Sequence, residues 1–238
     1  MGMVHGPNMV TDGLKFYLDA GNVRSYPGSG STWYDLGDRD YNVTAVGSPT
    51  HSSNNGGYFA FDGTNDYFYT NSTPVSTWPA EIYSLHIWFR VDHTNAYENI
   101  YSQFMNNYRI GNPFIDMGSS GQMRIMEFRI QQNIASNTHY WYTANGIITA
   151  DVWQCITVVR PSIGINDSNL NFYQNGQEVS LTATTGSFGT SWTRPTSIGG
   201  ADGNPALIDI AIVCQYNKAL SAAEVLHNYN AHKSRFGL

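Results

Sequence analysis

The sequence predicts an all-β fold, built as a two-sheet sandwich or a barrel. Short strand-like runs recur at intervals of about 8 to 12 residues between turn-forming residues, which is typical of such folds. Helical patterns are confined to the C-terminal end, so a parallel sheet that alternates with helices is excluded. The clearest run, residues 83–91 (YSLHIWFRV), keeps a period of two and predicts a half-buried antiparallel strand.

The first part of the chain predicts four more strands. They are residues 13–20, 41–46, 58–61 and 67–69. In the first of them Leu14, Phe16 and Leu18 fall on one face, which we expect to point inward. The turn-forming sequence DGTND separates the last two, and this arrangement predicts a β-hairpin.

The second half of the chain continues in the same way. Its candidate strands are residues 100–104, 108–110, 123–130, 153–159, 169–174 and 178–181. The pair Asn175-Gly176 favours the positive φ angles that a two-residue hairpin requires. Residues 138–143 (THYWYT) are interpreted as an aromatic-rich polar loop.

The C-terminal region predicts a strand followed by a helix that closes the fold. Residues 207–213 are a β-branched run typical of a strand. One face of this strand carries Ile208, Ile210 and Ile212, and the other carries Asp209, Ala211 and Val213. Ser221 and Glu224 have the spacing of a capping box, which predicts a helix over about residues 222–233.

Composition limits the class of protein. Of the 238 residues 41% are hydrophobic and 13% are charged, with a formal net charge of −6 and no basic run, which argues against a nucleic-acid groove. No apolar run approaches the roughly 20 residues of a membrane-spanning helix, and the first residues show no secretory signal. Cys155 and Cys214 lie in apolar runs, as buried thiols do, while a disulfide between them stays open.

Four segments taken together resemble a known family. They are FAFDGTNDYF at 59–68, YSLHIWFRV at 83–91, WQCITVV and LNFYQNGQEV within 153–179, and IGG and IDIAIVCQYNKALSAAEV within 198–225. In this order they are similar to the laminin-G-like jelly roll of the concanavalin-A-like lectin and glucanase superfamily. The opening GLKFYLDAGNVRSYPGSGSTWYDLG and the ending ALSAAEVLHNYNAHKSRFGL further resemble laminin-G-like proteins encoded by tailed bacteriophages of aquatic bacteria.

The resemblance implies a jelly-roll sandwich of two curved antiparallel sheets, with the first strand beside the late strand at 207–213. We expect one laminin-G-like domain over residues 1–238, with an N-terminal arm at 1–10 and a C-terminal helix and tail at 221–238. Rim loops and a concave face are the places where such folds usually meet glycans or partners.

Catalytic carboxylates are the first chemistry to look for in this superfamily. The glucanases resemble one another in a strand bearing Glu-x-Asp-x-Glu, which suits retaining hydrolysis. The nearest frame here centres on Asp209, but Leu207 and Ala211 stand where Glu is required. The sequence therefore predicts no enzyme of that type, although a carboxylate pair formed by the fold, such as Glu127 with Asp116, stays open.

Calcium is the next candidate, because laminin-G-like domains often bind it through loop carboxylates. Oxygen ligands in loops suit this ion. The candidate ligands are Asp62, Asp66, Asp202 and Asp209. The alternative is that the acidic residues of DGTND shape a turn by binding backbone N–H groups, and we favour this interpretation.

Glycan binding would need aromatic platforms with polar neighbours. The candidates are Trp88, Tyr140, Trp141, Tyr142, Trp192 and Arg194. The alternative for each ring is packing in the core or at a subunit interface, which we favour for any single one.

The family resemblance leads to a functional expectation. It implies a non-enzymatic virion structural protein that decorates a phage head or belongs to the tail or fibre. We expect it to be made in the host cytoplasm, to contact other virion proteins and to form a homo-oligomer. Two alternatives are a lectin-like module for host surface polysaccharide and a polysaccharide-degrading enzyme.

Overall fold

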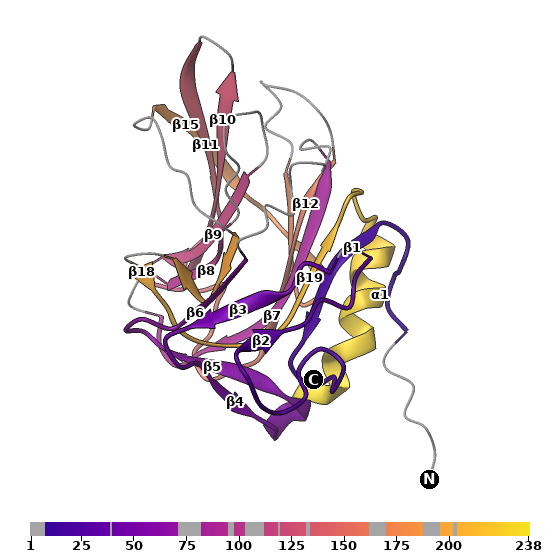
Figure 1. Cartoon of the computed structure of the whole chain (residues 1–238). Coiled ribbons are helices and arrows are strands. Elements are labelled where there is room, and N and C mark those ends of the chain that lie inside the picture. Colours follow the sequence, from indigo (N-terminus) through magenta and orange to yellow (C-terminus); the bar gives the residue numbers. More distant parts are fainter. Residues whose placement is uncertain are drawn as a thin grey trace.

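The chain folds into two antiparallel sheets packed face to face, with a helix on the outer face of the first sheet (Figure 1). This computed structural model describes residues 8–38, 40–70, 82–94, 98–102, 112–118, 120–131, 134–161, 170–187, 196–201 and 204–238. The predicted all-β sandwich with a short C-terminal helix is therefore confirmed.

The first sheet has eight strands in the described residues, in the order β14-β13-β12-β7-β19-β5-β4, with β1 also paired to β19. These strands are β1 (Leu14–Asp19), β4 (Thr50–Ser52), β5 (Tyr58–Asp62), β7 (Tyr83–Val91), β12 (Gln154–Arg160), β13 (Asn171–Gln174), β14 (Gln177–Val179) and β19 (Leu207–Tyr216).

The second sheet has nine strands in the described residues, in the order β15-β11-β10-β9-β8-β16-β6-β3-β2. They are β2 (Thr32–Trp33), β3 (Val43–Val46), β6 (Tyr67–Thr70), β8 (Glu98–Ser102), β9 (Asn112–Gly118), β10 (Gln122–Gln131), β11 (Ile134–Tyr142), β15 (Thr182–Ser187) and β16 (Thr196–Ile198). A small ribbon joins β17 (Gly200–Ala201) to β18 (Asn204–Pro205), and the helices are α1 (Ala222–His232) and the 3₁₀ turns η1 (Asn54–Gly56) and η2 (Lys233–Phe236).

Strand β19 lies at the centre of the first sheet. It pairs with β7 on one side; on the other it pairs first with β5, at Leu207–Ile210, and then with β1, at Ile212–Tyr216. The expected pairing of the first strand with the late strand is confirmed. Because β19 holds three other strands, the C-terminal unit completes the sheet.

A β-bulge at Ala211 changes which side chains of β19 face inward. The register with β7 shifts between Ile210 and Ile212. Ile208, Ile210 and Val213 therefore join the cluster between the sheets, whereas Ile212 joins the cluster under the helix. The prediction that Ile212 shares a face with Ile208 and Ile210 is wrong, because an extra residue in a strand reverses the alternation beyond it.

The predicted half-buried strand at 83–91 is buried on both faces. Its inward residues, such as Leu85 and Phe89, pack between the sheets as expected. On its other face His86 and Trp88 are fully buried against α1 and the tail, and Arg90 is partly exposed. The helix that the capping box predicts therefore supplies the cover that the strand pattern alone does not reveal.

Two turns test the predicted connections. Asn175 and Gly176 adopt φ angles of 50° and 76° between β13 and β14, which confirms that hairpin. The hairpin predicted around DGTND is wrong, because β5 pairs within the first sheet and β6 within the second. The loop at 63–66 instead crosses from one sheet to the other.

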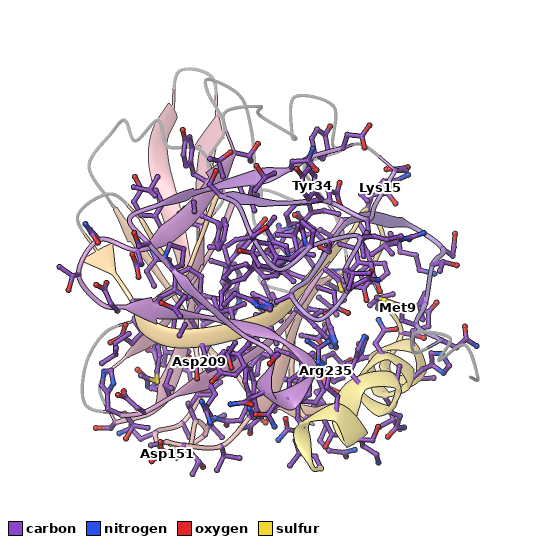
Figure 2. All side chains as sticks on the ribbon, turned by 60° about the horizontal axis from the view of Figure 1, so that its bottom comes forward. Met9, Lys15, Tyr34, Asp151, Asp209 and Arg235 are labelled. Carbon is purple, nitrogen blue, oxygen red and sulfur yellow. The ribbon has the colours of Figure 1, made fainter. Side chains whose placement is uncertain are left out.

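The C-terminal helix begins at the predicted cap. The Ser221 Oγ accepts the N–H of Glu224, while the Glu224 carboxylate accepts the N–H of Ser221 at 2.8 Å. Beyond the helix, the Arg235 guanidinium donates to the Asp19 carboxylate of β1 and to the carbonyl oxygens of Asn55 and Gly57. Figure 2 shows Arg235 where the helix meets the strands. The tail is thus tied to the start of the chain.

Helix α1 has 11 residues. Among the described residues, no helix is long and apolar enough to cross a membrane.

We expect Ser221→Ala to lower the free energy of unfolding by about 1 kcal/mol, because it removes the side-chain acceptor at the helix start. Chemical denaturation monitored by tryptophan fluorescence measures this loss. Ser234→Ala, an exposed serine of η2, is the matched control and should change little. Equal stability of the two variants would contradict the capping role.

Two histidines make the interface between α1 and the first sheet sensitive to acid. His86 of β7 and His232 of α1 are buried, with ring centroids 6.4 Å apart. Burial, and then the neighbouring His232, lower the pKa of His86 to about 3, and burial also lowers the pKa of His232. His86 contacts Thr157 and Cys155, whereas Asp19 and Arg235 act on His232 with opposite sign.

The free energy of unfolding should be highest above about pH 6.5, the ordinary histidine pKa. It should decrease as the pH falls from there toward the lowered pKa values of the folded protein, because unfolding lets both rings take up protons. His232→Gln should flatten this acid-side loss by removing one of the two groups. His227→Gln, at an exposed position of the same helix, should leave the slope unchanged. Thermal melting across this pH range measures the effect, and identical slopes in all three proteins would contradict it.

Candidate functional site

Trp88 is not an exposed sugar platform. Its side chain is fully buried, and its indole stacks on Tyr229 at 5.6 Å and on Phe236 at 4.3 Å between ring centroids. Because two aromatic rings of the C-terminal segment cover it, Trp88 offers no face to a ligand. This burial corrects the expectation from its place on the more polar face of the strand.

The aromatic segment at 138–143 belongs largely to strand β11 rather than to a loop. Residues 137–142 pair with β10 and with β15. Trp141 is 1% exposed and belongs to the core between the sheets, so it is not a free platform. Tyr142 is half-buried. The side chain of Tyr140, and Trp192 and Arg194 entirely, lie outside the described residues, and their role stays a prediction.

Asp62 and Asp66 accept backbone N–H groups of their own loop and of Ser48. Asp66 is buried, and its two oxygens accept the N–H of Ser48 at 2.6 Å and that of Asp62 at 3.3 Å. The Asp62 carboxylate accepts the N–H of Thr64 at 2.8 Å, and such bonds lower its pKa. The bond from Thr64 to Asp62 is that of an Asx turn, whereas Asp66 ties the loop to Ser48.

A hollow of about 350 Å³ lies beside these two carboxylates, between the loop and Gly47 and Ser48. Within the described part of the chain, no group of three or more His, Cys, Asp or Glu side chains is arranged to hold a metal. Asp202 lies outside that part. Calcium binding stays a prediction, and the contacts that Asp62 and Asp66 make are hydrogen bonds with backbone N–H groups.

Asp209 projects on the helix side of the first sheet. The Arg90 guanidinium donates to its Oδ2 through both Nε, at 2.9 Å, and Nη2. Burial raises the pKa of Asp209, whereas Arg90 counteracts the shift. Arg90 also lies over the rings of Tyr58 and Trp153, which hold it in place. Asp209, which stands where the glucanases that the chain resembles carry their catalytic strand, is thus neutralised by the Arg90 guanidinium.

Glu98 is engaged in structural contacts, and Asp116 and Glu127 are not opposite each other in the β9–β10 pair. Glu98 is buried and accepts the N–H of Leu207 at 2.6 Å, while its other oxygen pairs with His93 at 2.8 Å. The pair left open by the sequence is not matched in register, because Asp116 lies opposite Arg124 whereas Glu127 lies opposite Pro113.

The structure shows a larger pocket that the sequence does not predict. It measures about 520 Å³ and lies where the chain crosses from the edge of the first sheet (β14) to the edge of the second (β15). We call it the edge pocket. It is lined by Trp141, Leu170, Asn171, Glu178, Val179, Ser180, Leu181 and Ala183. The nearest sequence signal is the Asn175-Gly176 hairpin, which predicts the β13–β14 pair but neither the edge position of β14 nor the sheet that follows.

Both cysteines are free and buried under the helix. Burial raises the pKa of the Cys155 and Cys214 thiols well above the ordinary value. Such thiols are poor nucleophiles, so their role here is packing.

A family model described as the concanavalin A-like lectin/glucanases superfamily (Laminin_G_3) matches residues 62–226. The chain belongs to this superfamily. The match begins at Asp62, ends within α1 and includes β19 and the edge pocket. In sequence, no curated protein matches the chain.

Solved structures of low sequence identity share this concanavalin A-like fold. The binding domain of Paraclostridial mosquitocidal protein 1 has a TM-score of 0.63 at 12% identity, over 92% of this chain and 52% of that chain. The binding domain of botulinum neurotoxin DC in complex with rat synaptotagmin II gives 0.62 at 14%, over 93% and 52%. A Trypanosoma rangeli sialidase mutant displaying trans-sialidase activity gives 0.62 at 13%, over 98% and 35%.

At these identities the likeness shows the fold alone. The chain also spans only about half, or less, of the length of these proteins. Their activities and partners therefore do not transfer to this member of the superfamily.

We expect Asp66→Ala to destabilise the fold by about 1 to 3 kcal/mol, because it removes a buried charged acceptor of two backbone hydrogen bonds. Asp62→Ala, at an exposed position of the same loop, should cost less. The measurement is thermal unfolding in millimolar calcium and in chelator. A turn role predicts the same loss in both conditions, and a loss that appears only with calcium would instead assign Asp66 to a metal site.

Proposed function

We propose that this chain is a non-enzymatic structural protein of a bacteriophage virion, either a head decoration or a part of the tail or fibre. It acts through protein–protein contacts and through adhesion to host surface glycans. The similarity of its opening and ending segments to laminin-G-like phage proteins supports the virion setting. Membership of the concanavalin A-like superfamily supports a binding module as its general type.

The observation that carries the non-enzymatic part is the ion pair of Asp209 with Arg90. In the glucanases that the chain resembles, this strand bears paired carboxylates, one to attack and one to transfer a proton. Here Leu207 and Ala211 flank Asp209. A carboxylate held by a guanidinium that itself packs over Trp153 is a structural anchor, because a nucleophile must reach substrate.

The proposal includes a homo-oligomer, because modules on virion surfaces occupy symmetric positions. It also includes synthesis in the host cytoplasm followed by assembly onto the particle with other virion proteins. Mass photometry of the purified chain reports the oligomeric state directly.

A second candidate is a lectin-like receptor-binding module for host polysaccharide. The edge pocket favours it, because a concave site with polar and apolar walls suits a small ligand better than a flat protein surface does. The structural neighbours described as binding domains are consistent with this general role. The two candidates are compatible, because one virion protein can decorate the particle and also adhere to host polysaccharide.

Imaging of purified virions tests the proposal. Cryo-electron microscopy with a specific antibody should show the protein at repeated, symmetric sites on intact particles. Particles that carry none of it would contradict the virion role. Release of reducing ends from host envelope polysaccharide by the purified chain would contradict the non-enzymatic assignment, and Asp209→Asn would then show whether that strand is involved.

A further inference from the structure

Helix α1 and the turn η2, residues 222–236, lie on the outer face of the first sheet and are called here the C-terminal cover (Figure 1). The cover contributes no strand to either sheet, so it can leave without breaking a ladder. The chain just before it is anchored, because the Leu220 N–H donates to the Ser84 Oγ of β7 at 2.8 Å. A hinge after Leu220 would therefore release the cover as one unit, since terminal helices can open while the rest of a fold stays closed.

Two buried histidines lie at the interface between the cover and the sheet. The Nδ1 of His86 on β7 lies 2.8 Å from the Thr157 Oγ1, and both its ring nitrogens lie 3.6 Å from the Cys155 Sγ. The Nδ1 of His232 on α1 lies 3.1 Å from the Asn228 carbonyl oxygen, and its Nε2 has no hydrogen-bond partner among the described residues. Within that part of the chain, neither ring is hydrogen-bonded to a carboxylate.

The acidic group that acts on His232 already has a cation of its own. The Asp19 carboxylate of β1 accepts from the Arg235 Nη1 at 2.6 Å and from the Tyr17 hydroxyl at 3.2 Å. Burial has the largest effect on the pKa of His232 and lowers it, while Asp19 raises it and Arg235 lowers it further. A proton on this ring is therefore opposed by the docked cover.

The other titratable groups at this interface are neutral or cationic. Burial raises the pKa of the Cys155 and Cys214 thiols, so both stay protonated. The Lys233 Nζ of η2 lies 5.6 Å from the centroid of the Tyr229 ring. The two imidazoles, with centroids 6.4 Å apart, would repel each other when both are charged. Protonation thus adds positive charge to an interface that cannot neutralise it.

The docked cover also hides two indole N–H groups. Trp88 stacks against Phe236, and the Trp153 ring centroid lies 4.7 Å from that of Phe236. The Nε1 atoms of both tryptophans are buried and have no hydrogen-bond partner among the described residues. Because a buried donor without a partner costs free energy, release of the cover recovers part of the apolar contact energy that it loses.

A third histidine responds to acid in the opposite sense. The His93 Nδ1 lies 2.6 Å from Asp92, and its Nε2 lies 2.8 Å from Glu98, which also accepts the Leu207 N–H. Partial burial lowers the pKa of His93, but the two carboxylates outweigh that effect and raise it. A histidine with a raised pKa adds stability at low pH and loses it as the pH rises. Acid therefore strengthens the junction of β7, β8 and β19.

We propose that the C-terminal cover is a pH-sensitive switch. When His86 and His232 take up protons, the cover leaves the first sheet and exposes Trp88 and Trp153, while the two sheets stay folded. The opening is local, so it is distinct from acid unfolding of the whole chain. It does not depend on the proposed function.

Hydrogen exchange measured by mass spectrometry on the full chain at pH 7.5 and pH 5 tests the proposal. Exchange in α1, corrected for the intrinsic effect of pH, should rise about 10³-fold, or about thirtyfold for each histidine that is neutral when docked and has its ordinary pKa when open. Peptides from β7 and β19 should change far less. The dye 8-anilinonaphthalene-1-sulfonate, which binds apolar surface, should gain fluorescence over the same range.

Variants assign the protons. His86→Gln and His232→Gln should each reduce the rise to about thirtyfold, and the double variant should abolish it. His227→Gln, at an exposed position of α1, is the matched control and should keep the full rise. The ratio between the two pH values is taken within each variant, so a change in basal stability cancels. Thermal melting at pH 7.5 shows that each variant is folded.

Four results would overturn the inference. A rise of less than about threefold in α1 of the unmodified protein would show that the histidines do not drive opening. An equal rise in β7 and β19 would mean that the whole chain unfolds. An undiminished rise in the double variant would assign the effect to other groups. Faster exchange in α1 without a gain in dye fluorescence would mean that the helix frays in place and the tryptophans stay covered.

Discussion

The fold depends on the docking of its C-terminal segment on the outer face of the first sheet. Trp88 lies between Tyr229 and Phe236, so one large indole on β7 is covered by two rings from α1 and η2. Without that cover the sheet would expose a contiguous apolar surface, which soluble folds avoid. Arg235 adds a polar anchor by donating to the Asp19 carboxylate of β1. The last residues of the chain therefore complete the layer that its first strand begins.

The bulge at Ala211 lets β19 serve both layers of packing. Before it, Ile208 and Ile210 point into the sandwich; beyond it, Ile212 and Cys214 point toward the helix. The bulge lies where the partner of β19 changes from β5 to β1, and the Ala20 N–H binds the Ala211 carbonyl there at 3.0 Å. A strand specialised in this way for packing has its one carboxylate, Asp209, held by Arg90. The proposal that this chain is not an enzyme of the glucanase type rests on this ion pair.

The sequence predicts those parts of the fold that depend on neighbouring residues. Alternation identifies β7, the Asn175-Gly176 pair identifies the β13–β14 hairpin, and Ser221 with Glu224 identify the start of α1, because each signal acts within a few residues. Contacts between distant segments were not predictable. DGTND fits a hairpin or a crossing between sheets equally well, and the burial of Trp88 depends on a helix more than a hundred residues later. For the same reason the edge pocket, made by four strand segments, has no local signature.

Helix docking and the edge pocket are physically linked, although they lie on different parts of the first sheet. Tyr229 of α1 contacts both Trp88 beneath the helix and Gly176 at the turn of the β13–β14 hairpin. Asn171 and Glu178 of that hairpin are among the residues that line the pocket. Because Gly176 has a φ of 76° and close neighbours in α1, the turn cannot shift without disturbing the helix. The packing that covers the sheet thus also sets the position of the β13–β14 hairpin.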